Sequence, residues 1–122
     1  TSKSSNLNYK FISIFYKNFM YRLITTTTDS QKNVKLIVDN ILSSKLSPCI
    51  QVIKNIESFY VWDGEAENNL EYLILIKCES RNEARITELI LNSHTYEVPE
   101  IIASNFDILN PDYASWFSQN SI

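Results

Sequence analysis

Apolar and polar residues alternate along parts of this chain with the two-residue period of a β-strand. The alternation is clearest over residues 69–78, where every second side chain is apolar, at Leu70, Tyr72, Ile74 and Ile76. Leu73 and Leu75 occupy intervening positions, which indicates that much of both faces of this strand is covered. Three further stretches have the Thr, Ile and aromatic content that favours strands, namely residues 22–28, 49–62 and 98–106.

Helical periodicity separates these strands. After Asp29 or Ser30, either of which is a suitable N-cap, an apolar stripe runs along Val34, Ile37, Val38, Ile41, Leu42 and Leu46. Ser80 and Glu83 have the spacing of a capping box, which predicts a second helix with a buried side of Ile86, Leu89 and Ile90. Asn110 followed by Pro111 predicts the start of a short third helix, whose apolar face holds Tyr113, Trp116 and Phe117.

The order of these elements predicts an α+β fold, the ferredoxin-like βαββαβ arrangement, followed by a short C-terminal helix. Asp63-Gly64 is the turn signal between the second and third strands, and residues 67–69 are an alternative turn. Fully extended, residues 49–62 would span roughly 46 Å, whereas a compact chain of this length is only about 35 Å across. The hairpin is therefore predicted to project, and its aromatic end needs cover from another subunit.

Composition narrows the classes of protein. The 122 residues fit one domain over residues 20–122, preceded by an N-terminal extension over residues 1–19. A single glycine, Gly64, excludes glycine-rich phosphate loops and dinucleotide fingerprints. The net charge of −3 argues against nucleic acid as a partner. No apolar run approaches the roughly 20 residues of a membrane span.

The extension is basic, because it contains Lys3, Lys10 and Lys17 and no acidic residue precedes Asp29. This composition is typical of a targeting leader, so residues 1–19 are either a leader remnant or a terminal segment that docks on the domain or is disordered. We expect a cytoplasmic location, or an organellar one if the segment is a leader remnant.

Four segments carry a resemblance to a known family. They are residues 58–65 (Ser-Phe-Tyr-Val-Trp-Asp-Gly-Glu), 75–77 (Leu-Ile-Lys), 94–100 (His-Thr-Tyr-Glu-Val-Pro-Glu), and 110–113 (Asn-Pro-Asp-Tyr) with Trp116. In this order and spacing, over about residues 21–117, the chain resembles the CutA divalent-cation-tolerance proteins. The resemblance implies a homotrimer that binds divalent metal ions, copper among them, in metal tolerance or homeostasis. Two alternatives stay open, a signalling-like trimer with small-molecule clefts between subunits and a structural adaptor for a partner protein.

His94 is the only histidine of the chain, so any imidazole chemistry of a subunit depends on it. Glu97 and Glu100 follow within six residues, which makes the three side chains candidate ligands of a divalent metal ion. The alternative is a histidine that only satisfies carbonyls at the end of the second helix. In the family this segment reads His-Pro-Tyr-Glu-x-Pro-Glu, and Thr95 here replaces the first proline, so the loop is less rigid.

Cys49 and Cys78 are the only cysteines. A two-residue turn at Asp63-Gly64 without a bulge would place them opposite each other, as a disulfide or a soft metal pair. We predict instead two reduced thiols that pack as small apolar groups. Cys49 matches a common family cysteine and is the less favoured metal ligand, whereas Thr25 stands where the family has a copper-linked cysteine.

The resemblance also implies a cleft between subunits, lined by Trp62, Lys77, Tyr96 and Glu100. A lysine on a largely covered strand needs a carboxylate or a ligand, so Lys77 belongs either to a ligand site or to a structural ion pair with Glu97 or Glu100. A second acidic group lies at the tip of the hairpin and consists of Asp63, Glu65 and Glu67. It is either a weak cation site or a solvated turn, and we predict the solvated turn.

Enzymatic chemistry finds little support in the sequence. A catalytic triad would have to use His94, and no serine lies in a Gly-x-Ser-x-Gly elbow. No motif assigns acid and base roles to the carboxylates. The sequence therefore predicts a binding protein rather than an enzyme.

Overall fold

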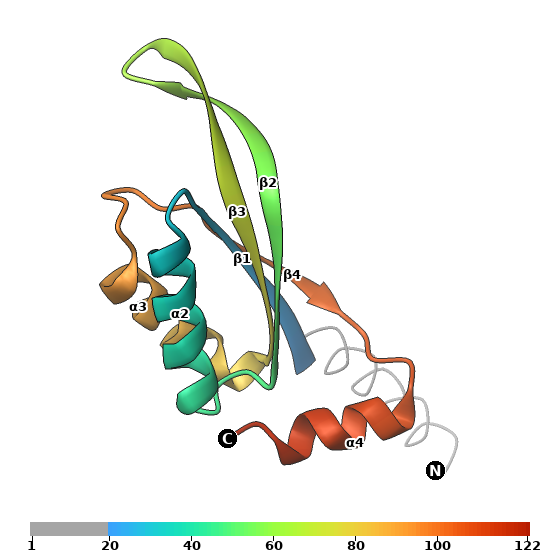
Figure 1. Ribbon diagram of the computed structural model, residues 1–122. Coiled ribbons are helices and arrows are strands. Elements are labelled where there is room, and N and C mark those ends of the chain that lie inside the picture. Colours follow the sequence, from blue (N-terminus) through green and yellow to red (C-terminus); the bar gives the residue numbers. More distant parts are fainter. Residues whose placement is uncertain (1–19) are drawn as a thin grey trace, which may run out of the picture.

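The computed structural model describes residues 20–122, so the predicted extension, residues 1–19, lies outside the described residues. The elements follow the predicted order (Figure 1): β1 (Tyr21–Thr28), α2 (Gln31–Ser43), β2 (Cys49–Trp62), β3 (Glu65–Glu79), the short helix η1 (Ser80–Asn82), α3 (Glu83–Ser93), β4 (Ile101–Phe106) and α4 (Pro111–Gln119). Within residues 20–122, no helix combines the length and the apolar character needed to cross a bilayer.

The four strands form one antiparallel sheet in the order β2-β3-β1-β4, which confirms the ferredoxin-like prediction. Helices α2 and α3 lie side by side on one face of this sheet (Figure 1). Ser30 is the N-cap of α2 and accepts a hydrogen bond from the Asn33 amide at 3.2 Å. Asn110 caps α4 in the same way, with Pro111 at the first helical position, as predicted.

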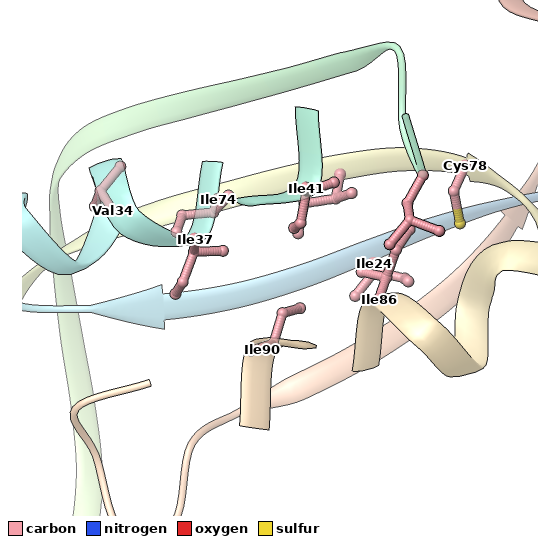
Figure 2. Close-up of a cluster of buried hydrophobic side chains, with 10 residues drawn as sticks. Ile24, Val34, Ile37, Ile41, Ile74, Cys78, Ile86 and Ile90 are labelled. Carbon is pink, nitrogen blue, oxygen red and sulfur yellow. The ribbon is translucent and has the colours of Figure 1, made fainter. Parts of the chain in front are cut away.

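The core lies between this face and the two helices, and it consists mainly of isoleucines (Figure 2). Its most buried members come from both layers: Ile24, Ile37, Ile41, Ile74, Ile76, Ile86 and Ile90. The helix stripe was predicted correctly at Val34, Ile37 and Ile41. It was wrong at Leu42, which is 43% exposed because each helical residue turns about 100° from its neighbour, and this moves Leu42 off the buried face.

The opposite face of the sheet is only partly covered by the described residues. α4 packs over one end of it, where Phe117 is buried against the rings of Tyr21 and Phe106 at centroid distances of 5.6 and 6.4 Å. Further along this face, Ile53 and Ile102 are 48% and 58% exposed, although both are large apolar side chains. Residues 20–122 therefore complete the core on the helical side and leave part of the other face exposed.

The β2–β3 hairpin projects beyond the helices (Figure 1). Its turn is Asp63-Gly64, with positive φ values of 50° and 76°, as a tight hairpin turn requires. β3 begins directly after the turn at Glu65, so it is longer than predicted and the alternative turn at residues 67–69 is wrong. The tip carboxylates are exposed, which confirms the predicted solvated turn.

A β-bulge in β2 was not predicted. The register shifts between Ile53 and Ile56, where Asn55 takes a φ of 61°. As a result, Cys49 pairs with Lys77 rather than with Cys78. The unbulged register is therefore wrong, and both cysteines are free thiols, as predicted.

Two predicted boundaries also differ from the structure. The capping box at residues 80–83 is absent, because Ser80 lies in η1 and Glu83 instead accepts a hydrogen bond from Arg22 Nε at 2.9 Å. β4 begins at Ile101 rather than at residue 98, so Pro99 and Glu100 remain in the α3–β4 loop. This longer loop lies beside the end of β1 and contributes to the site described next.

Candidate functional site

A pocket of about 630 Å³ lies where the hairpin leaves the sheet. The end of β2, the facing part of β3, the end of β1 with the loop after it, and the α3–β4 loop supply its walls. Aromatic side chains form part of the lining, namely Phe59, Tyr60, Trp62 and Tyr96. Carboxylates form another part, namely Asp29, Glu71, Glu97 and Glu100. Pockets of this volume are typical of small-molecule sites.

His94 fixes the α3–β4 loop to strand β1. Its Nε2 lies 2.8 Å from the carbonyl oxygen of Thr27, and its Nδ1 accepts a hydrogen bond from the Tyr96 amide at 3.0 Å. An acceptor at Nδ1 and a carbonyl at Nε2 require the neutral tautomer with its proton on Nε2. The ring therefore has no free lone pair in this geometry, and its contacts are those of a structural histidine.

Asn33 supports the same loop from helix α2. It is buried, and its Nδ2 donates a hydrogen bond to the Ser93 carbonyl at 2.8 Å. Its Oδ1 accepts hydrogen bonds from the Thr28 hydroxyl at 3.0 Å and from the Thr95 amide at 3.3 Å. Three elements thus meet at one amide side chain, which holds the rim of the pocket in a defined position.

Glu71 is a nearly buried carboxylate inside the pocket, with an exposed fraction of 7%. The Tyr96 hydroxyl donates a hydrogen bond to it at 2.7 Å. Burial raises the pKa of Tyr96 above its usual range, and the hydrogen bond and charge of Glu71 raise it further, so the phenol stays protonated as the donor. The ion pairs of residues 20–122 join other residues, so within this part of the chain Glu71 has no cationic partner.

The predicted metal ligands share the α3–β4 loop but do not form a ready-made centre. Glu97 and Glu100 line the pocket, whereas both nitrogens of His94 are hydrogen-bonded. In residues 20–122, no group of three His, Cys, Asp or Glu side chains gathers closely enough to hold a metal ion. His94 as a ligand stays a prediction, and it requires the ring to leave both of its partners.

Three of the four predicted cleft residues line the pocket, namely Trp62, Tyr96 and Glu100. Lys77 does not, because it lies six residues along β3 from Glu71, roughly 20 Å away at about 3.3 Å per residue. Its Nζ instead lies 4.0 Å from Cys49 Sγ. The predicted pair with Glu97 or Glu100 does not form within the described part of one subunit.

The cysteines lie in different environments. Cys49 is half-buried beside Lys77 and the hydroxyl of Tyr113, whose pKa is raised by burial and by its contact with Cys49. Cys78 is fully buried in the core. Burial raises the pKa of the Cys78 thiol to about 12, the carboxylates of Glu83 and Glu79 add to the rise, and Arg22 opposes it. Cys78 is therefore a packing residue.

Sequence reasoning missed Glu71 and Asp29 as members of the site. Glu71 looked like an ordinary polar position in an alternating strand. The sequence nevertheless contained a signal, because Glu71 lies on the same face of β3 as Leu73 and Leu75. A carboxylate on a face that is covered needs a partner. Asp29 was considered only as an N-cap, a role that Ser30 takes.

The family model of the CutA1 divalent ion tolerance protein matches residues 22–120. Protein CutA of Mus musculus is 34% identical over 93 residues, which are 76% of this chain and 52% of the mouse protein. The divalent-cation tolerance protein CutA of Thermus thermophilus is 26% identical over 102 residues, 84% of this chain and 99% of that protein. The chain spans about half the length of the animal and plant relatives it matches.

Solved structures are similar over most of the chain. CutA1 from Oryza sativa aligns with a TM-score of 0.80 and 27% identity, covering 87% of this chain and 97% of that one. The divalent ion tolerance protein CutA1 from Ehrlichia chaffeensis aligns with a TM-score of 0.78 and 29% identity, covering 84% and 96%. The fold of residues 20–122 is thus the fold of these proteins.

Proposed function

Because this chain belongs to the CutA1 divalent ion tolerance family, we propose that it acts as a homotrimer that binds divalent metal ions, copper among them, in cation tolerance. The role in this proposal is binding rather than catalysis, in keeping with a family of divalent ion tolerance proteins. The cytoplasmic location expected from the sequence belongs to the same proposal.

The projecting hairpin supports the trimer. Phe59 and Val61 are each 72% exposed in one subunit, and β2 is an edge strand of fourteen residues. A long apolar edge is an aggregation hazard unless another chain covers it, and closed cyclic symmetry covers it without leaving a new free edge. The half-open face with Ile53 and Ile102 offers further apolar area for such contacts.

The acidic rim of the pocket carries the cation-binding part of the proposal. Asp29, Glu97 and Glu100 are exposed carboxylates around one opening, and carboxylate oxygens are ligands that hard divalent ions prefer. A single subunit supplies no converging group of three ligands in its described part, so water or a second subunit would complete the coordination. For copper, which prefers softer ligands, His94 and Cys49 remain the candidates.

Calorimetric titration with Cu(II), Zn(II) and Mg(II) tests metal binding. We expect saturable binding at a defined ratio per trimer, weakened when Glu97→Gln and Glu100→Gln are combined and unchanged in Glu65→Gln at the hairpin tip. His94→Ala is compared in parallel, and loss of binding in this variant alone would move the site to the imidazole. No saturable binding of any of these ions would reject the metal-binding function.

Light scattering at micromolar concentration tests the assembly separately. We expect the mass of three chains, and a mass of one chain would reject the trimer.

A second function, small-molecule binding, is favoured by the volume and aromatic lining of the pocket. Such a ligand would raise the melting temperature in the absence of added metal.

A further inference from the structure

We propose that the pocket binds a small organic ammonium ion, a primary amine or diamine, with Glu71 as its buried anionic partner. The inference deepens the small-molecule function proposed above and rests on it, and it does not depend on metal binding. Charge, burial and size each support this class of ligand.

The charge of the lining is of one sign. Four carboxylates line the pocket, and among residues 20–122 no Lys, Arg or His lines it. A cleft with charges of one sign concentrates the opposite ion and repels ions of the same sign. The site therefore disfavours phosphates and carboxylic acids and favours cations.

The burial of Glu71 indicates where the cation sits. Its side chain is more than nine-tenths buried and lines the pocket. Within residues 20–122 it receives one hydrogen bond, from the neutral Tyr96 hydroxyl. A buried carboxylate that lacks a cationic partner is costly to the folded state. Such a cost is a common feature of binding sites, because a cationic ligand that enters supplies the missing charge.

The size of the pocket distinguishes an organic cation from a metal ion. A metal ion needs several oxygens within about 2.0–2.6 Å, and the carboxylates of residues 20–122 do not converge in this way. An ammonium group instead donates up to three hydrogen bonds of about 2.8 Å. The carbon chain of a diamine separates its two ammonium groups, so carboxylates that lie apart can both be contacted. The space of about 630 Å³ accommodates such a chain.

The aromatic walls suit the same ligand. Tyr60 and Trp62 line the pocket beside the carboxylates and are 42% and 50% exposed. Aromatic faces attract ammonium groups and also cover methylene groups. The wall formed by Tyr96 is already positioned, because His94 accepts a hydrogen bond from its backbone amide and the two rings lie in a tilted arrangement at a centroid distance of 4.8 Å.

The test is a titration with 1,5-diaminopentane in metal-free phosphate buffer that contains a chelator. We expect saturable binding with one site per subunit and a rise in melting temperature. Two compounds of the same chain length serve as controls, the neutral 1,5-pentanediol and the dianion glutarate, and neither should bind. Equal binding of the diol, or no saturable binding of the diamine, would overturn the proposal.

Two charge-matched variants locate the site. Glu71→Gln keeps an acceptor for Tyr96 but removes the buried charge, so the diamine affinity should fall at least about tenfold. Its melting temperature without ligand should be equal to or higher than that of the wild type, because an unpaired buried charge is gone. Glu65→Gln changes the net charge equally, lies outside the pocket, and should bind as the wild type does.

The outcomes separate this inference from the metal-binding function. Unchanged diamine affinity in Glu71→Gln would show that the binding is non-specific attraction to an acidic protein and would reject the inference. If the diamine does not bind and the metal ions do, the ammonium site is rejected and the metal-binding function stands. If no metal ion binds and the diamine binds with an affinity that depends on Glu71, the metal-binding function is rejected and the ammonium site stands.

Discussion

The helix-covered core and the projecting hairpin both contain large apolar side chains but differ in how far these are buried. In the core, Ile37 and Ile41 are fully buried between the sheet and helix α2 (Figure 2). In the hairpin, Phe59 and Val61 are mostly exposed in one subunit. Within residues 20–122, apolar side chains are thus buried in one region and exposed in the other.

The two regions therefore have different roles, because one stabilises the fold of the subunit and the other presents a surface for contacts. Burial of apolar area contributes about 25 cal/mol per Å², so the core stabilises the subunit by itself. The exposed apolar end of the hairpin contributes little to an isolated subunit, and an exposed patch of this kind marks a surface that contacts something else. The pocket lies at the boundary between the two regions, because both the anchored α3–β4 loop and the hairpin line it.

The largest effect is expected in the core. Ile37→Ala should lower the free energy of unfolding by roughly 2–5 kcal/mol, because it removes buried methyl groups and leaves a cavity. Leu36→Ala is the matched control, since Leu36 is the preceding residue on α2 and is 49% exposed. Chemical denaturation of both variants measures the difference. Equal losses would mean that the exposed side of α2 is also buried in the assembly.

The core could be predicted from the sequence because helix and strand periodicities are local. The stripe through Val34, Ile37 and Ile41 needs only 3.6 residues per turn to place it on one face. The bulge at Asn55 could not be predicted, since an extra residue in β2 is a property of its pairing with β3. Leu42 failed for a similar reason, because the width of the buried face depends on what packs against it.

The second largest effect on stability is expected in the α3–β4 loop, which lines the pocket together with the hairpin. His94→Ala should lower the free energy of unfolding by about 1–3 kcal/mol, because the Thr27 carbonyl and the Tyr96 amide lose their partner. Asn92→Ala, at an exposed position just before it, should change stability little. Denaturation curves compare the two variants. A fully stable His94→Ala variant would contradict the structural role of the imidazole.

The site could be predicted only in part, for reasons that are also physical. Tyr96, Glu97 and Glu100 were found because they lie in one short segment. Glu71 joins them from a distant strand, and only the fold brings its carboxylate to the Tyr96 hydroxyl. The two hydrogen bonds of His94 were equally invisible, because the Thr27 carbonyl belongs to another strand.

A third effect appears only at high pH and belongs to the core. The pKa of Cys78 is raised from 9.0 to about 12, mainly by burial, so folding favours the neutral thiol. This contribution to stability is fully present below about pH 9 and is lost as the pH rises towards 12. Near neutral pH the contribution of the Cys78 thiol to stability does not change with pH.

Two measurements check this expectation. The melting temperature of the wild type should fall more steeply above pH 9 than that of Cys78→Ala, each compared with its own value at pH 7. In the native protein at pH 8, a thiol reagent should modify the half-buried Cys49 before Cys78. Rapid modification of Cys78 would contradict its place in the core.

The smallest effect on an isolated subunit is expected at the hairpin, and one substitution made at two positions compares the regions directly. Val34 is 9% exposed in the core, whereas Val61 is 72% exposed beside the hairpin turn. Val34→Ser should be clearly destabilising, while Val61→Ser should cost at most about 0.5 kcal/mol when the chains are dilute. Unfolding at several protein concentrations, with light scattering at each, measures both. If the cost of Val61→Ser rises with concentration as the trimer forms, the hairpin is part of a second core, built between subunits; if it stays small while the trimer persists, Val61 lies outside the contact.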